Sequence, residues 1–104
     1  MELILTKDIH KGLKLYGNAP DAKLIDVRTA EEYAQGHIPG SINLPLNILE
    51  DDIFDAVPDM STPIFLYCLS GSRSIQAAAA LQELGYDNAA SIGGIEDYMG
   101  YLEK

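Results

Sequence analysis

Short apolar runs alternate with segments of helical periodicity along the whole chain, and this alternation restricts the fold more than any other feature. The apolar runs predict strands at residues 2–6, 23–27, 42–44, 63–67 and 89–92. The periodic segments predict helices at residues 8–16, 30–35, 47–57 and 95–102, and a further helix between the loop 69–74 and Gly85. Strands separated by helices pair in parallel through right-handed crossovers. The sequence therefore predicts an α/β fold with a mostly parallel sheet and helices on both faces.

The only cysteine, Cys68, lies where the apolar run 64–67 ends and a loop and helix follow. Such a junction turns successive backbone N–H groups inward, and the helix adds about half a positive charge at its N-terminus. Negative charge on the sulfur is stabilised there, which favours the reactive thiolate. A small buried core residue is the alternative interpretation of a single cysteine. The glycine, the small hydroxyl residues and Arg73 in the loop favour a nucleophile instead.

The formal net charge of −9 argues against nucleic acid and anionic membranes as partners, because both are bound through basic patches. The densest acidic cluster, 50–52 with Asp55, is predicted to be a solvated helix face. A negative field also repels small anions. An anionic substrate therefore needs a local positive site, and the loop after Cys68 is the candidate.

The length of 104 residues predicts one domain, 1–104, with a modest core of its own. No apolar stretch approaches the roughly 18 residues of a membrane span, and the N-terminus carries an acid where a signal peptide has basic residues. A single cysteine cannot form an internal disulfide, which is compatible with a reducing compartment. We therefore expect a cytoplasmic protein.

Four segments together resemble the rhodanese-like domain family in their order and spacing. They are 24–28 with 31–33, 36–45, 68–74 and 91–95. The resemblance spans nearly the whole chain, and the length resembles that of single-domain rhodaneses. It implies a five-stranded α/β sheet and sulfurtransferase activity of the thiosulfate:cyanide type.

The resemblance also implies a mechanism that needs no metal or organic cofactor. The Cys68 thiolate would attack the sulfane sulfur of thiosulfate, or of a persulfide or polysulfide donor, and keep it as a persulfide. Cyanide or a thiol, including a protein thiol, would then accept the sulfur. The loop would bind the donor and surround the terminal sulfur with N–H groups and hydroxyls. The residues expected in this role are Leu69, Ser70, Gly71, Ser72, Arg73 and Ser74.

Loop length favours sulfur over phosphorus as the transferred element. The residues 69–72 separate Cys68 from Arg73, whereas phosphatase relatives have one residue more between cysteine and arginine. A phosphatase or arsenate reductase is therefore disfavoured. Leu69 stands where many active relatives have a basic or hydroxyl residue, which predicts weak thiosulfate binding and suits a thiol or protein-bound persulfide donor. It also supports the alternative of a non-enzymatic sensing or docking module.

Other polar residues near the motifs are expected to have structural roles. Arg73 could bind the oxyanion of the donor, or it could brace the loop through carbonyls and a nearby carboxylate. Asp26 and Arg28 are predicted to form a buried brace at a strand end. His37 is predicted to be part of the scaffold, because a thiolate needs no general base. Thr29 and Glu32 predict a capping box at the start of the helix 30–35.

Overall fold

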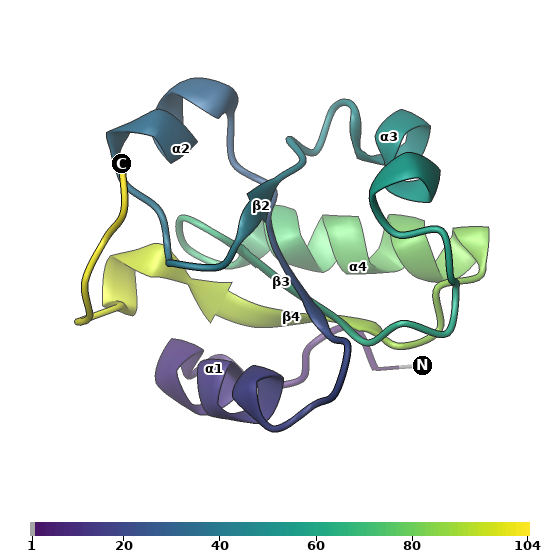
Figure 1. The fold of residues 1–104 in the computed structure, drawn as a ribbon, viewed down its shortest axis with the longest axis horizontal. Coiled ribbons are helices and arrows are strands. Elements are labelled where there is room, and N and C mark those ends of the chain that lie inside the picture. The colour runs from purple at the N-terminus through teal and green to yellow at the C-terminus, as the bar shows by residue number, and fades with distance from the viewer. Residues whose placement is uncertain (1) are drawn as a thin grey trace.

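A parallel sheet of four strands forms the centre of the computed structural model, which describes residues 2–104. The elements in chain order are α1 (Ile9–Gly17), β1 (Lys23–Asp26), α2 (Ala30–Gln35), β2 (Ile42–Asn43), α3 (Leu49–Ala56), β3 (Ile64–Cys68), α4 (Ser72–Leu84), β4 (Ala89–Gly94) and the 3₁₀ helix η1 (Ile95–Asp97). The strand order is β2-β1-β3-β4, and all neighbours pair in parallel (Figure 1). The predicted parallel α/β fold is confirmed.

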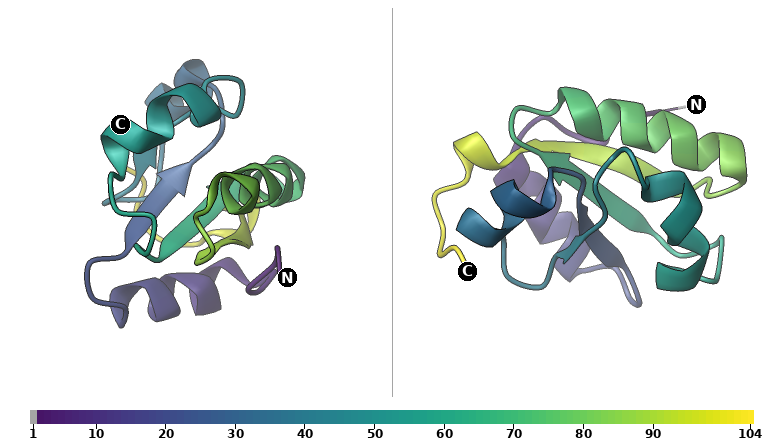
Figure 2. Two further views of the ribbon diagram at one scale, coloured as in Figure 1. Left: turned by 90° about the vertical axis from the view of Figure 1, so that its right-hand side faces the viewer. Right: turned by 90° about the horizontal axis from the view of Figure 1, so that it is seen from above.

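Helices cover both faces of the sheet. Figure 2 shows α1 on one side, and α3 and α4 on the other. The larger core cluster lies under α3 and α4, and the smaller one lies under α1. All residues of the central strand β3 are buried because both of its faces are covered. A Cβ at Gly12 of α1 would collide with the Ile92 side chain of β4, so α1 packs directly on the sheet there.

The predicted first strand, 2–6, is wrong, so the sheet has four strands rather than five. The segment forms only an isolated parallel bridge between Ile4 and Ser91. Its pairing ends because the chain turns into α1, where the Asp8 side chain accepts hydrogen bonds from the N–H groups of His10 and Lys11.

The predicted closing helix, 95–102, is also wrong beyond its first turn. η1 ends at Asp97, and Tyr98 is already extended. Two contacts hold the following chain in place: Tyr98 stacks on His10, and the N–H of Met99 donates to Nε2 of His10. Glu103 then pairs with His37 in an antiparallel bridge. A glycine at position 100 further disfavours a helix.

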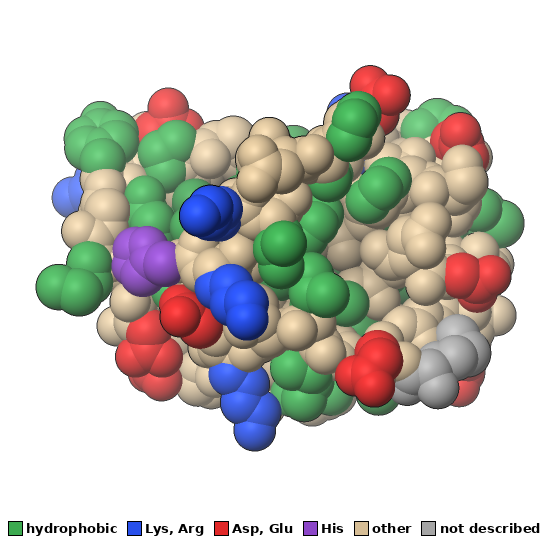
Figure 3. All heavy atoms as spheres, turned by 90° about the horizontal axis from the view of Figure 1, so that it is seen from below, with side chains coloured by type: hydrophobic (Ala, Val, Ile, Leu, Met, Phe, Trp, Pro, Cys, Tyr) green, Lys and Arg blue, Asp and Glu red, His purple; other side chains and the backbone are tan. Residues whose placement is uncertain are grey.

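Charge is unevenly distributed over the surface. The acidic cluster of Glu50, Asp51, Asp52 and Asp55 is exposed on α3, as predicted, with its first members in the first turn, where acids favour a helix. Figure 3 shows Lys and Arg side chains on the opposite face, which carries α1, together with scattered Asp and Glu side chains. No helix within residues 2–104 is long and apolar enough to cross a membrane.

Candidate active site

Cys68 is the last residue of β3 and lies at the carboxyl end of the sheet. Gly71, with a φ of 109°, turns the chain directly into α4, so the helix begins at Ser72 and the loop is shorter than predicted. The loop also packs closely on β4, because a Cβ at Gly94 would collide with the backbone of Leu69 and Ser70. The sulfur is thus held between a central strand and the start of a long helix.

Two groups from the start of α4 contact the sulfur. The N–H of Gly71 donates to Sγ of Cys68 at 3.0 Å, and the thiol can donate to Oγ of Ser74 at 3.7 Å. The amides of the first helical turn, 72–74, have no carbonyl partner within the helix. The structure therefore brings one N–H group and one hydroxyl to the sulfur. The side chains of Ser70 and Ser72, which were also expected to be donors, belong to exposed residues.

A hollow of about 380 Å³ is lined by Ser70, Gly71 and Ser72 next to Cys68. Two further hollows flank the loop, and Cys68 lines none of the three. The first of the two further hollows, of about 430 Å³, is lined by Leu69 together with Arg28, Glu32, Ile95, Glu96 and Leu102. The second, of about 340 Å³, is lined by Arg73 with Val27, Thr29 and Leu46. Cys68 itself is 0% exposed. The sulfur is therefore shielded from solvent in this structure.

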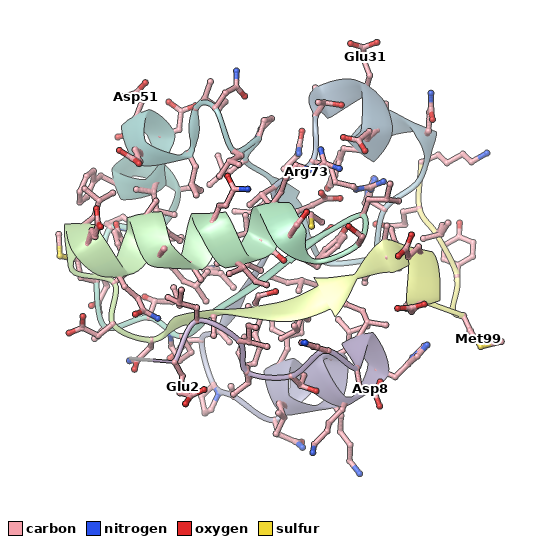
Figure 4. The ribbon with its side chains drawn as sticks, turned by 180° about the vertical axis from the view of Figure 1, so that it is seen from behind. Glu2, Asp8, Glu31, Asp51, Arg73 and Met99 are labelled. Atoms are coloured by element: carbon pink, nitrogen blue, oxygen red, sulfur yellow. The ribbon has the colours of Figure 1, made fainter. Side chains whose placement is uncertain are left out.

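Arg73 forms a paired contact with Glu32 of α2. Its Nη1 lies 2.7 Å from Oε1 and its Nη2 lies 3.0 Å from Oε2. Figure 4 shows Arg73 between the start of α4 and α2, whereas Glu31 of α2 points away from the molecule. Hydrogen bonds from Arg73, and then from Thr29, lower the pKa of Glu32 to about 2. Of the two expected roles of Arg73, the structure shows the contact with a nearby carboxylate, and donor binding stays a prediction.

Asp26 and Arg28 form the buried brace that the sequence predicts. The side chain of Arg28 donates from Nε and Nη2 to the Asp26 carboxylate, with a shortest distance of 2.7 Å. Nη2 also donates to the carbonyl of Gly36, and the backbone N–H of Arg28 donates to Oδ1 of Asp26. The pair thereby joins the end of β1 to the chain that follows α2.

His37 and Tyr67 stabilise the segment 36–41 beside the sheet. The His37 ring stacks on Tyr33 at 3.7 Å, and Nδ1 lies 2.9 Å from the Tyr33 carbonyl. The Tyr67 hydroxyl accepts from the N–H of Ile38 and lies 3.0 Å from Oγ of Ser41. Burial raises the pKa of Tyr67. These contacts confirm a scaffold role for His37.

Two residues of the site were not predicted in their observed roles. Glu32 was expected only in the capping box, which is present, and its contact with Arg73 was not foreseen. Ser91 of β4 is buried, with Oγ at 2.7 Å from Oγ of Ser74. The signal for Ser91 was a lone polar residue in an apolar strand. Within residues 2–104 no cluster of His, Cys, Asp and Glu side chains could hold a metal ion.

Comparisons with known proteins agree with this architecture. The family model of the rhodanese-like domain matches residues 10–100. The chain is 42% identical over 73 residues to the thiosulfate sulfurtransferase PspE of Escherichia coli, covering 70% of each protein. It is 35% identical over 95 residues to the human thiosulfate:glutathione sulfurtransferase, covering 80% of this chain and 81% of that protein.

Among solved structures, a rhodanese with anions from E. coli superimposes with a TM-score of 0.74 at 38% identity, covering 80% of this chain and 98% of that one. The family match extends over the strand, loop and helix that hold Cys68. The chain belongs to the rhodanese-like domain family and is a sulfurtransferase of that family.

Proposed function

We propose that this sulfurtransferase carries the transferred sulfur as a persulfide on Cys68. The Cys68 thiolate attacks the outer sulfur of thiosulfate and forms a new S–S bond. The bond between the two sulfurs of thiosulfate breaks, and sulfite leaves with its electron pair. A thiolate or cyanide then attacks the terminal sulfur of the persulfide, which returns Cys68 as a thiolate. The two half-reactions form a ping-pong cycle in which no net oxidation of the enzyme occurs.

The observation that carries the proposal is the position of the sulfur at the start of α4. The N–H of Gly71 donates to Sγ at 3.0 Å, and the amides of 72–74 face no carbonyl within the helix. A terminal persulfide sulfur is anionic, and fixed N–H donors stabilise such a charge without reorganising. The segment from Leu69 through Ser74, which includes the start of α4, binds the donor in this proposal, with the backbone contributing more than the exposed Ser70 and Ser72 hydroxyls.

The hollow beside Leu69 supports a donor other than free thiosulfate. Leu69 is 43% exposed, and its hollow also contains Ile95 and Leu102. The carboxylate of Glu96 lines it as well, whereas Arg28 and Glu32 in its wall are already paired with Asp26 and Arg73. Carboxylates repel the sulfonate of thiosulfate, whereas apolar walls suit the stem of a thiol persulfide. We therefore propose a persulfide or polysulfide as the preferred donor, and a thiol as the acceptor.

Sulfur transfer is tested by incubating the protein with thiosulfate and cyanide and measuring thiocyanate. We expect thiocyanate from the wild type and none from Cys68→Ser. Intact-mass spectrometry after treatment with thiosulfate or polysulfide should show a gain of about 32 Da on Cys68. A matched control is Ser61→Ala, which changes an exposed hydroxyl away from the site and should leave both results unchanged. Absence of the adduct with both donors would overturn the proposal.

The donor preference is tested by Leu69→Lys. A cation at this position should lower the KM for thiosulfate several-fold, and it should lower the KM for a neutral polysulfide much less. Leu69→Met is the matched control, since it keeps an apolar side chain of similar size. Equal effects of the lysine on both donors would contradict the explanation based on charge.

A further inference from the structure

We propose that Ser91 is a positioning residue that turns the hydroxyl of Ser74 toward the sulfur of Cys68. The inference rests on the proposed function, because it concerns the anionic sulfur of that reaction. Ser91 lies on β4, whereas Ser74 lies on α4. Both are almost fully buried, at 1% and 0% exposed.

The hydroxyl of Ser74 has three neighbours but only one proton. Its Oγ lies 3.7 Å from Sγ of Cys68, 2.9 Å from the carbonyl of Gly71 and 2.7 Å from Oγ of Ser91. A hydroxyl donates one hydrogen bond and accepts up to two. The direction of the Ser74 proton must therefore depend on which neighbour needs a donor.

The group that needs a hydrogen-bond donor from Ser74 changes when the sulfur of Cys68 loses its proton. As a thiol, Cys68 can donate to Ser74, and Ser74 can donate to the carbonyl of Gly71. As a thiolate, the sulfur only accepts, so the Ser74 proton must turn to it. The carbonyl of Gly71 can give up this donor because it still accepts from the N–H of Ile75 at 3.2 Å.

Ser91 stabilises the second arrangement. When Ser74 donates to the sulfur, its oxygen is free to accept from the hydroxyl of Ser91 at 2.7 Å. Oγ of Ser91 in turn accepts from the N–H of Gly93 at 3.3 Å. All donors from Gly93 to Cys68 then point toward the anion, and hydrogen bonds aligned in this way strengthen one another.

The backbone of Ser91 is fixed from outside the sheet. Its N–H donates to the carbonyl of Leu3 at 2.8 Å, and its carbonyl accepts from the N–H of Leu5 at 2.8 Å. The isolated bridge at Ile4 therefore coincides with the residue that contacts Ser74. Because these two hydrogen bonds fix the backbone of Ser91, its hydroxyl can orient that of Ser74 with little further loss of conformational freedom.

Several charged and titratable groups surround this chain of hydroxyls. Arg73 of α4 is paired with Glu32 of α2, and Asp26 of β1 is paired with Arg28. Tyr67 precedes Cys68 on β3, and Lys7 and Asp97 line a hollow of about 380 Å³ that Ser91 also lines. Variants of Ser74 and Ser91 leave all of these groups in place, so a change in the pH profile reports on the hydroxyls.

The test is the pH profile of Cys68 alkylation by iodoacetamide in the full chain. Loss of one donor to the anion should move the midpoint of the Ser91→Ala profile upward by about 0.5 to 1 pH unit, which is about three- to tenfold less thiolate below the midpoint. Ser74→Ala should have at least the same effect. Because Ser91 acts through Ser74, the double variant should match Ser74→Ala.

Two controls separate positioning from a structural role. Ser41→Ala also removes a buried hydroxyl, which is bonded to the Ile38 carbonyl, and it should not move the midpoint. Ser91→Thr keeps a hydroxyl and should retain the wild-type midpoint. A Ser91→Ala midpoint equal to that of the wild type would overturn the inference, as would an equal shift in the Ser74→Ala background.

The proposed function and the inference fail in different ways. Intact mass of the wild type after thiosulfate or polysulfide treatment tests the persulfide, and the alkylation profile tests Ser91. A persulfide on Cys68 together with an unmoved Ser91→Ala midpoint refutes the role of Ser91 alone. The absence of a persulfide together with a shifted midpoint refutes the proposed function alone.

Discussion

Two arginine–carboxylate pairs lie at the carboxyl end of the sheet, and they differ mainly in burial. In both, the shortest distance is 2.7 Å. The side chains of Asp26 and Arg28 are 0% and 7% exposed, whereas those of Glu32 and Arg73 are 30% and 31% exposed. The first pair joins segments of the scaffold, and the second joins α2 to α4, the helix that begins directly after the short loop following Cys68. The same chemistry thus lies in the buried scaffold at one place and beside the candidate site at the other.

Burial decides what the loss of one partner costs. A carboxylate left alone in the interior keeps its desolvation penalty, whereas a carboxylate near the surface recovers water. We therefore expect the buried pair to matter most for stability. The pair of Glu32 and Arg73 should matter more for sulfur transfer, since Glu32 lines the hollow beside Leu69 and Arg73 lines another hollow beside the loop.

The largest effect is expected from Arg28→Ala. This change leaves the Asp26 carboxylate buried without its guanidinium, so it should lower the free energy of unfolding by about 3 to 5 kcal/mol. Urea unfolding followed by circular dichroism measures the loss. Arg73→Ala is the matched control and should cost no more than about 1 kcal/mol. Equal losses of unfolding free energy in the two variants would contradict the expected difference between the buried and the partly exposed pair.

An intermediate effect is expected on activity when the partly exposed pair of Glu32 and Arg73 is changed. If Arg73 braces the loop through Glu32, Arg73→Ala and Glu32→Gln should both lower kcat/KM about five- to tenfold, or about 1 to 1.4 kcal/mol. Glutamine at position 32 can still cap α2, so its effect reports on Arg73. A fall in the KM for thiosulfate in Glu32→Gln would instead assign Arg73 to the donor, because the change frees its guanidinium.

The smallest effect is expected for the pH dependence of the stability that the pair of Glu32 and Arg73 contributes. The pKa of Glu32 is about 2 in the folded protein, below its ordinary value of 4.5, because Arg73 and Thr29 donate hydrogen bonds to the ionised form. The unfolded chain therefore binds this proton first as the pH falls. The stabilisation should be complete above about pH 5 and lost as the pH approaches 2, with a size below about 1 kcal/mol.

This pH dependence is measured as the difference in unfolding free energy between the wild type and Glu32→Gln. The difference should shrink steadily from about pH 6 to about pH 2.5. Asp55→Asn is the control for general acid effects, because Asp55 is an exposed residue of α3. A constant difference over this range would show that the ion pair contributes nothing to stability.

The sequence predicted those parts of the fold that local patterns determine. Apolar runs such as 64–67 become strands because both faces of the sheet are covered, and Thr29 with Glu32 forms the expected capping box. The failures at 2–6 and 95–102 have another cause. The first segment stops pairing where Asp8 caps α1, and the second leaves its helix because His10 and His37 bind it elsewhere. Such contacts join residues far apart in the chain.

The candidate site also has one part that local sequence patterns predict and another that depends on contacts between distant residues. The sequence predicted a cysteine between the end of a strand and the start of a helix. As that pattern suggests, the N–H of Gly71 donates a hydrogen bond to the sulfur. The partner of Arg73 is Glu32, 41 residues away, and Ser91 reaches Ser74 across 17 residues. Neither pairing follows from spacing, because each depends on how α2 and β4 pack beside α4.

The enclosure of Cys68 bears on the proposed persulfide intermediate. A persulfide is open to peroxides and stray thiols, and a cysteine on the surface can be oxidised beyond recovery. A sulfur atom with no exposed area meets solvent only when its surroundings open. If Cys68 carries a persulfide as proposed, this enclosure would limit the leakage of reactive sulfur between the two half-reactions.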